Sequence, residues 1–156
     1  MNYYPKRPVK SFQDLEVYQK LLAISVAIVK RITLERPSAD LDRICKHVPA
    51  DVLIQDIQDC VLSLPIKIAA AHSLRFGNSG QAIRILEEIM VGCNKIVVYL
   101  ELYRDLYNDN KIELEFFEDQ IKNILSTRFK ILHLQRSWIK FTPLAIKTEK
   151  SYGKTK

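Results

Sequence analysis

The chain is poor in glycine, with four glycines among 156 residues. An all-β fold needs many tight turns and a phosphate-binding loop needs clustered glycines, so this scarcity argues against both. The remaining composition, 47% apolar and 27% charged residues, suits one globular domain. A chain of this size buries roughly two-thirds of its unfolded surface, and it therefore needs neither disulfides nor a metal to build a core.

Cysteines and long apolar runs are also scarce. The three cysteines lie far apart and form no C-x-x-C pair, which indicates core or loop residues rather than a redox or zinc site. The longest apolar stretch, residues 21–29, is interrupted by Ser25 and is shorter than the ~18–20 residues that cross a bilayer. Residues 1–8 lack the apolar region of a signal peptide. The sequence predicts a cytoplasmic protein with no membrane partner.

No residue set typical of catalysis or metal binding occurs in the sequence. His47, His72 and His133 are isolated, whereas a helical metal site needs H-x-x-x-H or E-x-x-H spacing. A nucleophilic Ser or Cys would also need a base within hydrogen-bond reach. Neither a Walker loop nor a G-x-G-x-x-G motif is present. We therefore expect no enzyme activity, no cofactor and no metal.

Charge is unevenly distributed along the chain, whose net charge is +6. Residues 1–10 carry three cations and no acid, and residues 11–119 carry 12 basic and 17 acidic side chains. Residues 120–156 carry nine basic side chains and one acid, Glu149. Basic ends on a mildly acidic body indicate either an anionic partner or a role in solubility alone.

Apolar residues recur at three- and four-residue spacing in four long segments, which predicts four amphipathic helices. Residues 1–11 hold two prolines and three cations and should form a basic irregular arm. Pro143 should end the last helix before a basic flexible tail, 143–156, which leaves one domain over 12–142. The expected helices are Asp14–Leu34, Ala50–Leu74, Gly80–Asn108 and Ile112–Phe141.

Short turns after the second and third helices favour antiparallel neighbours, so we expect an all-α, up-down-up-down four-helix bundle. The apolar face of the fourth helix is wider than the third of the circumference that a closed bundle needs. Either self-association or a thick monomeric core accounts for this excess. The expected core faces of the first and fourth helices are Leu15, Tyr18, Leu22, Val26, Val29 and Ile32, and Leu114, Phe117, Ile121, Leu125, Leu132 and Ile139.

Cations gather on one side of the fourth predicted helix. At about 100° per residue they fall within one arc of roughly 120°, and lysines of the tail continue the arc. Such a surface binds phosphate backbones through charge and counterion release, although a solvated face with a soluble tail has the same composition. The residues of the arc are Lys122, Lys130, His133, Arg136 and Lys140, and those of the tail are Lys147, Lys150, Lys154 and Lys156.

Two further residues of this helix stand out. Arg128 projects to the middle of the apolar arc, where a charge must be paired or must face a polar lumen or a partner. A buried ion pair and an oligomer contact are both open at this point. Trp138 either closes the end of the bundle as a core residue or contacts a partner beside the neighbouring cations.

Two segments resemble the four-helix-bundle proteins known as 23S rRNA intervening-sequence proteins. Residues 11–20, S-F-Q-D-L-E-V-Y-Q-K, are similar to the F-x-D-L-x-V-W-Q-K run that opens that family. Ser63-Leu64-Pro65 with Ile68-Ala69 resembles its S-I-P-x-N-I-A-E-G stretch, but Lys67, Ala70 and Ala71 stand where the family has Asn, Glu and Gly.

The second half of the chain resembles one branch of that superfamily, Avd, the accessory protein of diversity-generating retroelements. Residues 95–106, K-I-V-V-Y-L-E-L-Y-R-D-L, are similar to the K-L-R-x-L-L-R-L-A-K-D-L ending of its third helix. Residues 136–140, R-S-W-I-K, are similar to the G-G-W-I-K close of its fourth helix. The resemblance implies a homopentameric barrel of bundles with a basic surface that binds nucleic acid and the retroelement's reverse transcriptase. It adds Arg104 as a candidate nucleic-acid contact.

The sequence thus leads to one main hypothesis, a non-catalytic Avd-like accessory protein that supports mutagenic retrohoming. It would hold RNA or DNA through Lys122, Lys130, Arg136, Lys140, Lys147, Lys150 and Arg104, with Arg128 and Trp138 at oligomer or partner contacts. Two alternatives remain: an intervening-sequence-type bundle of unassigned role, and an oligomeric protein–protein scaffold.

Overall fold

The computed structural model describes residues 9–34, 50–107 and 114–142. Within these ranges the chain is all-α, with a short 3₁₀ turn over Phe12–Asp14 and four α-helices. The described helix ends lie within two residues of the expected ones. The helices are α1 (Glu16–Leu34), α3 (Ala50–Leu74), α4 (Ser79–Tyr107) and α5 (Leu114–Lys140).

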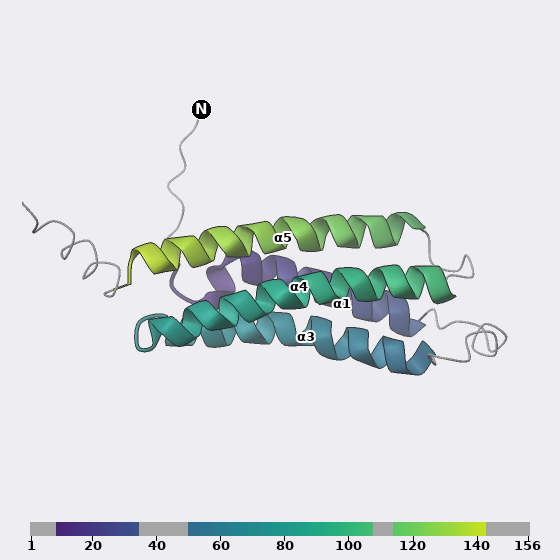
Figure 1. Cartoon of the computed structure of the whole chain (residues 1–156), viewed down its shortest axis with the longest axis horizontal. Coiled ribbons are helices and arrows are strands. Elements are labelled where there is room, and N and C mark those ends of the chain that lie inside the picture. Colours follow the sequence, from purple (N-terminus) through teal and green to yellow (C-terminus); the bar gives the residue numbers. More distant parts are fainter. Residues whose placement is uncertain (1–8, 35–49, 108–113, 143–156) are drawn as a thin grey trace, which may run out of the picture.

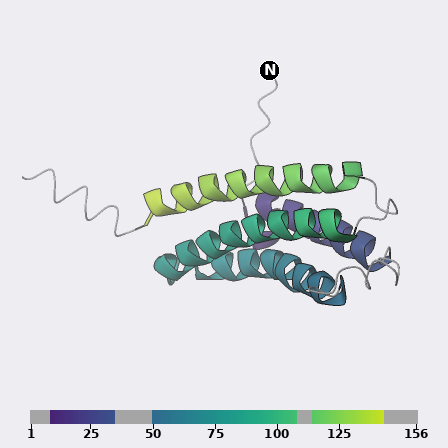
Figure 2. The same ribbon diagram turned by 45° about the vertical axis from the view of Figure 1, so that its right-hand side comes forward.

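The four helices run alternately up and down as one bundle (Figures 1 and 2). α1 packs between α3 and α5, and α4 packs between the same two helices on the opposite side, which closes a ring in the order α1–α3–α4–α5. α1 begins, α3 passes to α4, and α5 ends at the same end of the bundle, on the left in Figure 1. We call it the turn end, after the α3–α4 turn over residues 75–78. None of the described helices has the length and apolarity needed to cross a membrane.

Short polar side chains set where two of the helices begin. The Ser11 Oγ accepts a hydrogen bond from the backbone N of Gln13 at 3.2 Å, and the Asp14 carboxylate accepts from the backbone N of Ser11 at 3.0 Å. This capping box holds the 3₁₀ turn, so α1 itself begins at Glu16, two residues later than expected. At α4 the Asn78 Oδ1 accepts from the backbone N of Gln81 at 3.2 Å.

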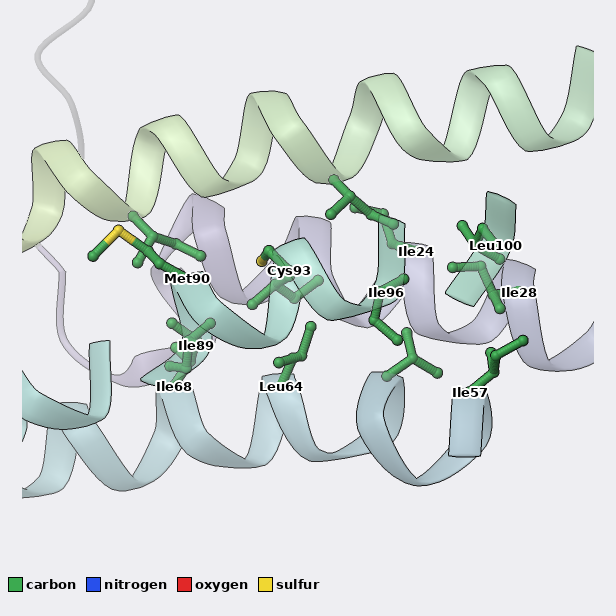
Figure 3. Packing of buried hydrophobic residues seen from close by; sticks show 14 of the residues in the cluster. Ile24, Ile28, Ile57, Leu64, Ile68, Ile89, Met90, Cys93, Ile96 and Leu100 are labelled. Carbon is green, nitrogen blue, oxygen red and sulfur yellow. The ribbon is translucent and has the colours of Figure 1, made fainter. Parts of the chain in front are cut away.

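The core runs along the bundle axis and is filled with branched aliphatic side chains (Figure 3). α3 and α4 each turn apolar residues into this core, and Ile57, Leu64, Ile68, Ile96 and Leu100 are all at most 2% exposed. Pro65 lies inside α3 and is buried, and the helix continues through it to Leu74.

The faces expected for α1 and α5 are right only in part. Leu15, directly before α1, Ile32 of α1 and Phe117 of α5 are buried as expected. Leu22 and Val26 of α1 are 43% and 44% exposed, and Leu125 of α5 is 46% exposed. The other buried residues lie beside the expected face of each helix, because both helices carry apolar residues over a wide arc and spacing alone does not choose among them. The buried stripes are Val17, Leu21, Ile24, Ile28 and Ile32 on α1, and Phe117, Ile124, Ile131 and Trp138 on α5.

Gly92 brings α3 and α4 into close contact. A methyl group added at Gly92 would lie 2.6 Å from the Cδ2 of Leu64, so a larger residue there would force the buried Leu64 side chain to shift. The same approach places the Cys60 thiol 3.8 Å from the carbonyl oxygen of Gly92.

Candidate nucleic-acid interface

The turn end combines two segments that contain no Asp or Glu. Residues 68–86, from α3 through the turn into α4, lack carboxylates, and so do residues 120–142 of α5. The fold brings them together, because the Gln135 side chain donates to the carbonyl oxygen of Ile83 at 3.3 Å. The sequence showed only the second of these segments, since residues 68–86 become its neighbours through the antiparallel packing of α4 on α5.

Among the described residues, carboxylates border the turn end at the start of α1 and at Glu88 of α4, and Glu88 is paired with Lys67. Asp14 accepts hydrogen bonds from the backbone N of Ser11 and of Lys10, and these bonds lower its pKa. Glu16 forms ion pairs with Lys20 and with Lys130. The turn end therefore presents an excess of positive charge to an approaching ligand.

The exposed cations Lys122, Arg136 and Lys140 of α5, with His133 between them, form a strip that we call the cationic stripe. All four side chains are exposed, and none forms an ion pair with a residue that the structure describes. Phe129 lies among them, 58% exposed, with its ring centroid 4.6 Å from that of His133. Cations alternating with an exposed ring can contact both phosphates and bases of a nucleic acid.

Lys130, expected in the same arc, lies at the side of α5 that faces α1. Its Nζ contacts the Glu16 carboxylate directly. A bound anion would have to compete with Glu16 for the Lys130 ammonium group. Lys130 therefore contributes less to anion binding than the cationic stripe does.

Arg104 lies at the other end of the bundle, near the start of α5. Its Nε donates to Asp105 at 2.8 Å, and this hydrogen bond raises the pKa of Arg104 and lowers that of Asp105. Glu101 and Glu118 are close enough to add to the effect on Arg104. The structure thus does not bring Arg104 to the stripe, and an acidic setting surrounds it. Lys147 and Lys150 lie outside the described residues.

Arg128 is half-buried beside α4, and its positive charge reaches Cys93. Its Nε is buried without a hydrogen-bond partner among the described residues. Within the part of the chain that the structure describes, Arg128 therefore does not form the buried ion pair that was one of its two expected roles. Trp138 is 5% exposed and closes the turn end as part of the core.

Sequence reasoning missed an aromatic cluster at the turn end. The Arg75 guanidinium lies 4.9 Å from the ring centroid of Phe76 and 5.2 Å from that of Trp138. With Phe141 these residues line a cavity of about 310 Å³. In the sequence, the one sign of this cluster is the aromatic Phe76 directly before the glycine of a turn. Trp138 comes to lie beside Arg75 only through the packing of α5 on α4.

A wider groove of about 800 Å³ lies between α3 and α4, and its lining mixes both charges. Lys67 there is paired with Glu88 at 3.2 Å. Within the described part of the chain, no group of three or more His, Cys, Asp or Glu side chains could hold a metal ion. The groove therefore offers an anion less than the turn end does.

Comparison of this chain with protein-family models, with curated proteins and with solved structures finds no match. The resemblance to Avd and to the intervening-sequence proteins remains a prediction.

Proposed function

We propose that this protein is a non-catalytic accessory protein of a diversity-generating retroelement, which binds RNA or DNA and the reverse transcriptase to support mutagenic retrohoming. The observation that carries the nucleic-acid part is the turn end, where two carboxylate-free segments meet, one of which carries the cationic stripe along α5. Lysine and arginine contacts to phosphates position a nucleic acid without reading its sequence. The association with a reverse transcriptase rests on the resemblance alone.

Two exposed apolar surfaces support self-association into a ring. One lies on the α1–α3 side, where Leu22 and Leu62 are 43% and 47% exposed. The other lies on α5 beside Arg128, where Leu125 and Ile139 are 46% and 42% exposed. The α1–α3 pair and the α4–α5 pair occupy opposite sides of the ring of helices. Contact of one surface with the other surface of the next copy is head-to-tail, and such contacts generate a closed ring when the rotation between copies closes, and an open filament otherwise. A pentamer is the ring that the resemblance implies.

The alternative of a protein–protein scaffold uses the same apolar surfaces but gives the turn end no ligand. An intervening-sequence-type role would keep the bundle without a reverse transcriptase. Nucleic-acid binding distinguishes the protein–protein scaffold from the accessory protein and the intervening-sequence type. Co-purification with a retroelement reverse transcriptase then distinguishes the accessory protein from the intervening-sequence type.

The test is RNA binding by the full-length protein across a salt series, with a short labelled RNA duplex as the probe. Replacing Arg136 and Lys140 by Gln should weaken binding at low salt. It should also reduce the log–log salt slope by about 1.8, because each duplex phosphate contact contributes about 0.9. A chain ending at Pro143 should lose a further part of the slope, because it lacks four lysines.

The matched control replaces Lys30 and Lys95, which are exposed cations outside the turn end. This control removes the same charge and should leave the slope nearly unchanged. Equal losses in the two double variants would mean that net charge alone, and not this surface, binds RNA. Absence of binding by the wild-type protein at low salt would leave the scaffold as the better account.

A further inference from the structure

The aromatic cluster at the turn end has properties that a bundle core does not require. Phe76 and Phe141 are 87% and 71% exposed, the two most exposed aromatic side chains among the described residues. They flank the 310 Å³ cavity, and Trp138 lies at its wall with its ring 5% exposed. Two large rings left in water forgo the free energy of burial, which is about 25 cal/mol per Å² of apolar surface.

A positive charge is held between these rings. The Arg75 guanidinium lies within 5.2 Å of the ring centroids of both Phe76 and Trp138, a distance typical of cation–π contacts. Arg75 forms no ion pair with any described residue, and the described residues that line the cavity include no carboxylate. The guanidinium therefore keeps its donors for a ligand and is orientated by the rings on either side.

Aromatic faces and a free guanidinium together match one kind of ligand. A nucleobase stacks on an aromatic ring, and the phosphate beside it accepts hydrogen bonds from arginine. The cationic stripe continues the charge, because Lys140 immediately precedes Phe141 and Arg136 lies two residues before Trp138. A protein partner that covered the rings alone would gain nothing from this continuous positive surface.

We propose that the cluster of Arg75, Phe76, Trp138 and Phe141 binds an unpaired nucleotide of a single-stranded nucleic acid. The base stacks on Phe76 and Phe141, and its phosphate is held by Arg75. Bases of an intact duplex are already stacked on their neighbours, so this site favours single strands, whereas the stripe binds either form. The inference rests on the proposed nucleic-acid function and adds to it a preference for unpaired segments.

Trp138 provides a direct signal, because it is the single tryptophan of the chain and its ring lines the cavity. The probes are an oligouridine of about 15 nucleotides, close to the upper site size of one single-strand-binding domain, and an RNA duplex of the same length. Oligouridine should quench Trp138 emission in the wild-type protein more strongly than the duplex does. Affinity for each probe is measured separately, by anisotropy of an end label.

Replacing Phe76 and Phe141 together by Leu keeps apolar side chains but removes the stacking faces. Because both rings are exposed, the double variant should melt as the wild type does. Its affinity for oligouridine should fall by roughly 5- to 100-fold, the loss that removal of base stacking produces, while its affinity for the duplex is retained. Leu34→Ala is the matched control, an 81% exposed apolar residue at the opposite end of the bundle, and it should change neither affinity.

Each contrary result overturns a different statement. Unchanged oligouridine affinity in the double variant refutes the stacking site but leaves the proposed function intact, provided that the duplex still binds. Failure of the wild-type protein to bind either probe refutes the proposed function and the site with it. A Trp138 signal that depends on protein concentration without RNA means that a second copy covers the rings, and this also overturns the proposal.

Discussion

Cys93 shows how burial decides the chemistry of a single residue. Its side chain is 0% exposed and faces the core from α4 (Figure 3). Burial raises the pKa of Cys93 to about 12, even though the nearby charge of Arg128 acts in the opposite direction. The thiol is therefore protonated and unreactive in the folded protein, which agrees with the expectation of an ordinary core residue.

This pKa gives a pH-dependent contribution to stability. The folded state holds the proton more tightly than the unfolded state, in which the pKa of the thiol is near its ordinary value of 9.0. The contribution is complete below that value and is lost as the pH rises toward the folded pKa. The stability advantage of wild type over Cys93→Ala should thus shrink by roughly 1.4 kcal/mol for each pH unit above the ordinary pKa of the thiol. Urea unfolding of both proteins over this range measures the difference, and parallel pH profiles would contradict the prediction.

The sequence identifies which residues are basic and exposed on a helix, but it does not show which of them pair with a carboxylate. The exposed positions of Lys122, Arg136 and Lys140 follow from helical spacing, and the structure places them together. Lys130 and Arg104 carry the same charge, yet each has a carboxylate beside it. Glu16, which pairs with Lys130, is 114 residues away in the chain, so no local pattern could reveal it.

At the scale of elements, the contact of α3 with α4 depends on the absence of a side chain at Gly92. Gly→Ala in a helix favours folding by about 1 kcal/mol through backbone entropy. The added methyl group would here meet the buried Leu64 at 2.6 Å, and overpacking of this kind costs about 1–3 kcal/mol. The clash and the helix preference therefore act in opposite directions at this position.

Gly92→Ala should destabilise the protein by about 1 kcal/mol in the wild-type background, because the cost of overpacking exceeds the gain in helix preference. In a Leu64→Ala background the clash is gone, and the same substitution should stabilise the protein. Urea denaturation of the four proteins of this double-mutant cycle gives both values. If Gly92→Ala changes the free energy of unfolding in the same direction in both backgrounds, Leu64 does not limit the approach of the helices.

The partly misassigned faces of α1 and α5 have a common cause. Each helix carries apolar residues over a wide arc, and only part of that arc is buried. Helical spacing predicts that an apolar face exists, but the neighbouring helices decide which part of it is covered. Single members of the expected core faces, Leu22 on α1 and Leu125 on α5, lie instead on the two exposed apolar surfaces.

At the scale of the whole molecule, these surfaces give a test of ring assembly that uses two single variants. Leu62→Glu places a charge on the α1–α3 surface and Leu125→Glu places one on the α5 surface. Both residues are about half exposed, at 47% and 46%, so the bundle should fold in each variant. If contacts are head-to-tail, each variant alone should be monomeric, while the wild type forms a closed oligomer.

A mixture of the two variants should then form a 1:1 pair with twice the 18.1 kDa mass of one chain, because one intact surface of each kind remains. Light scattering after size-exclusion chromatography measures these masses. A mixture that stays monomeric beside an oligomeric wild type would indicate a different interface. A monomeric wild type at micromolar concentration would refute self-association altogether.

The sequence by itself determined the helices, their ends and the cationic side of α5, because these depend on periodicity, capping and charge within a few residues. The tertiary structure alone decided which stripes of α1 and α5 are covered and which cations are paired. It likewise brought Arg75 and Trp138 together, because contacts between residues far apart in the chain depend on how helices pack and not on local spacing.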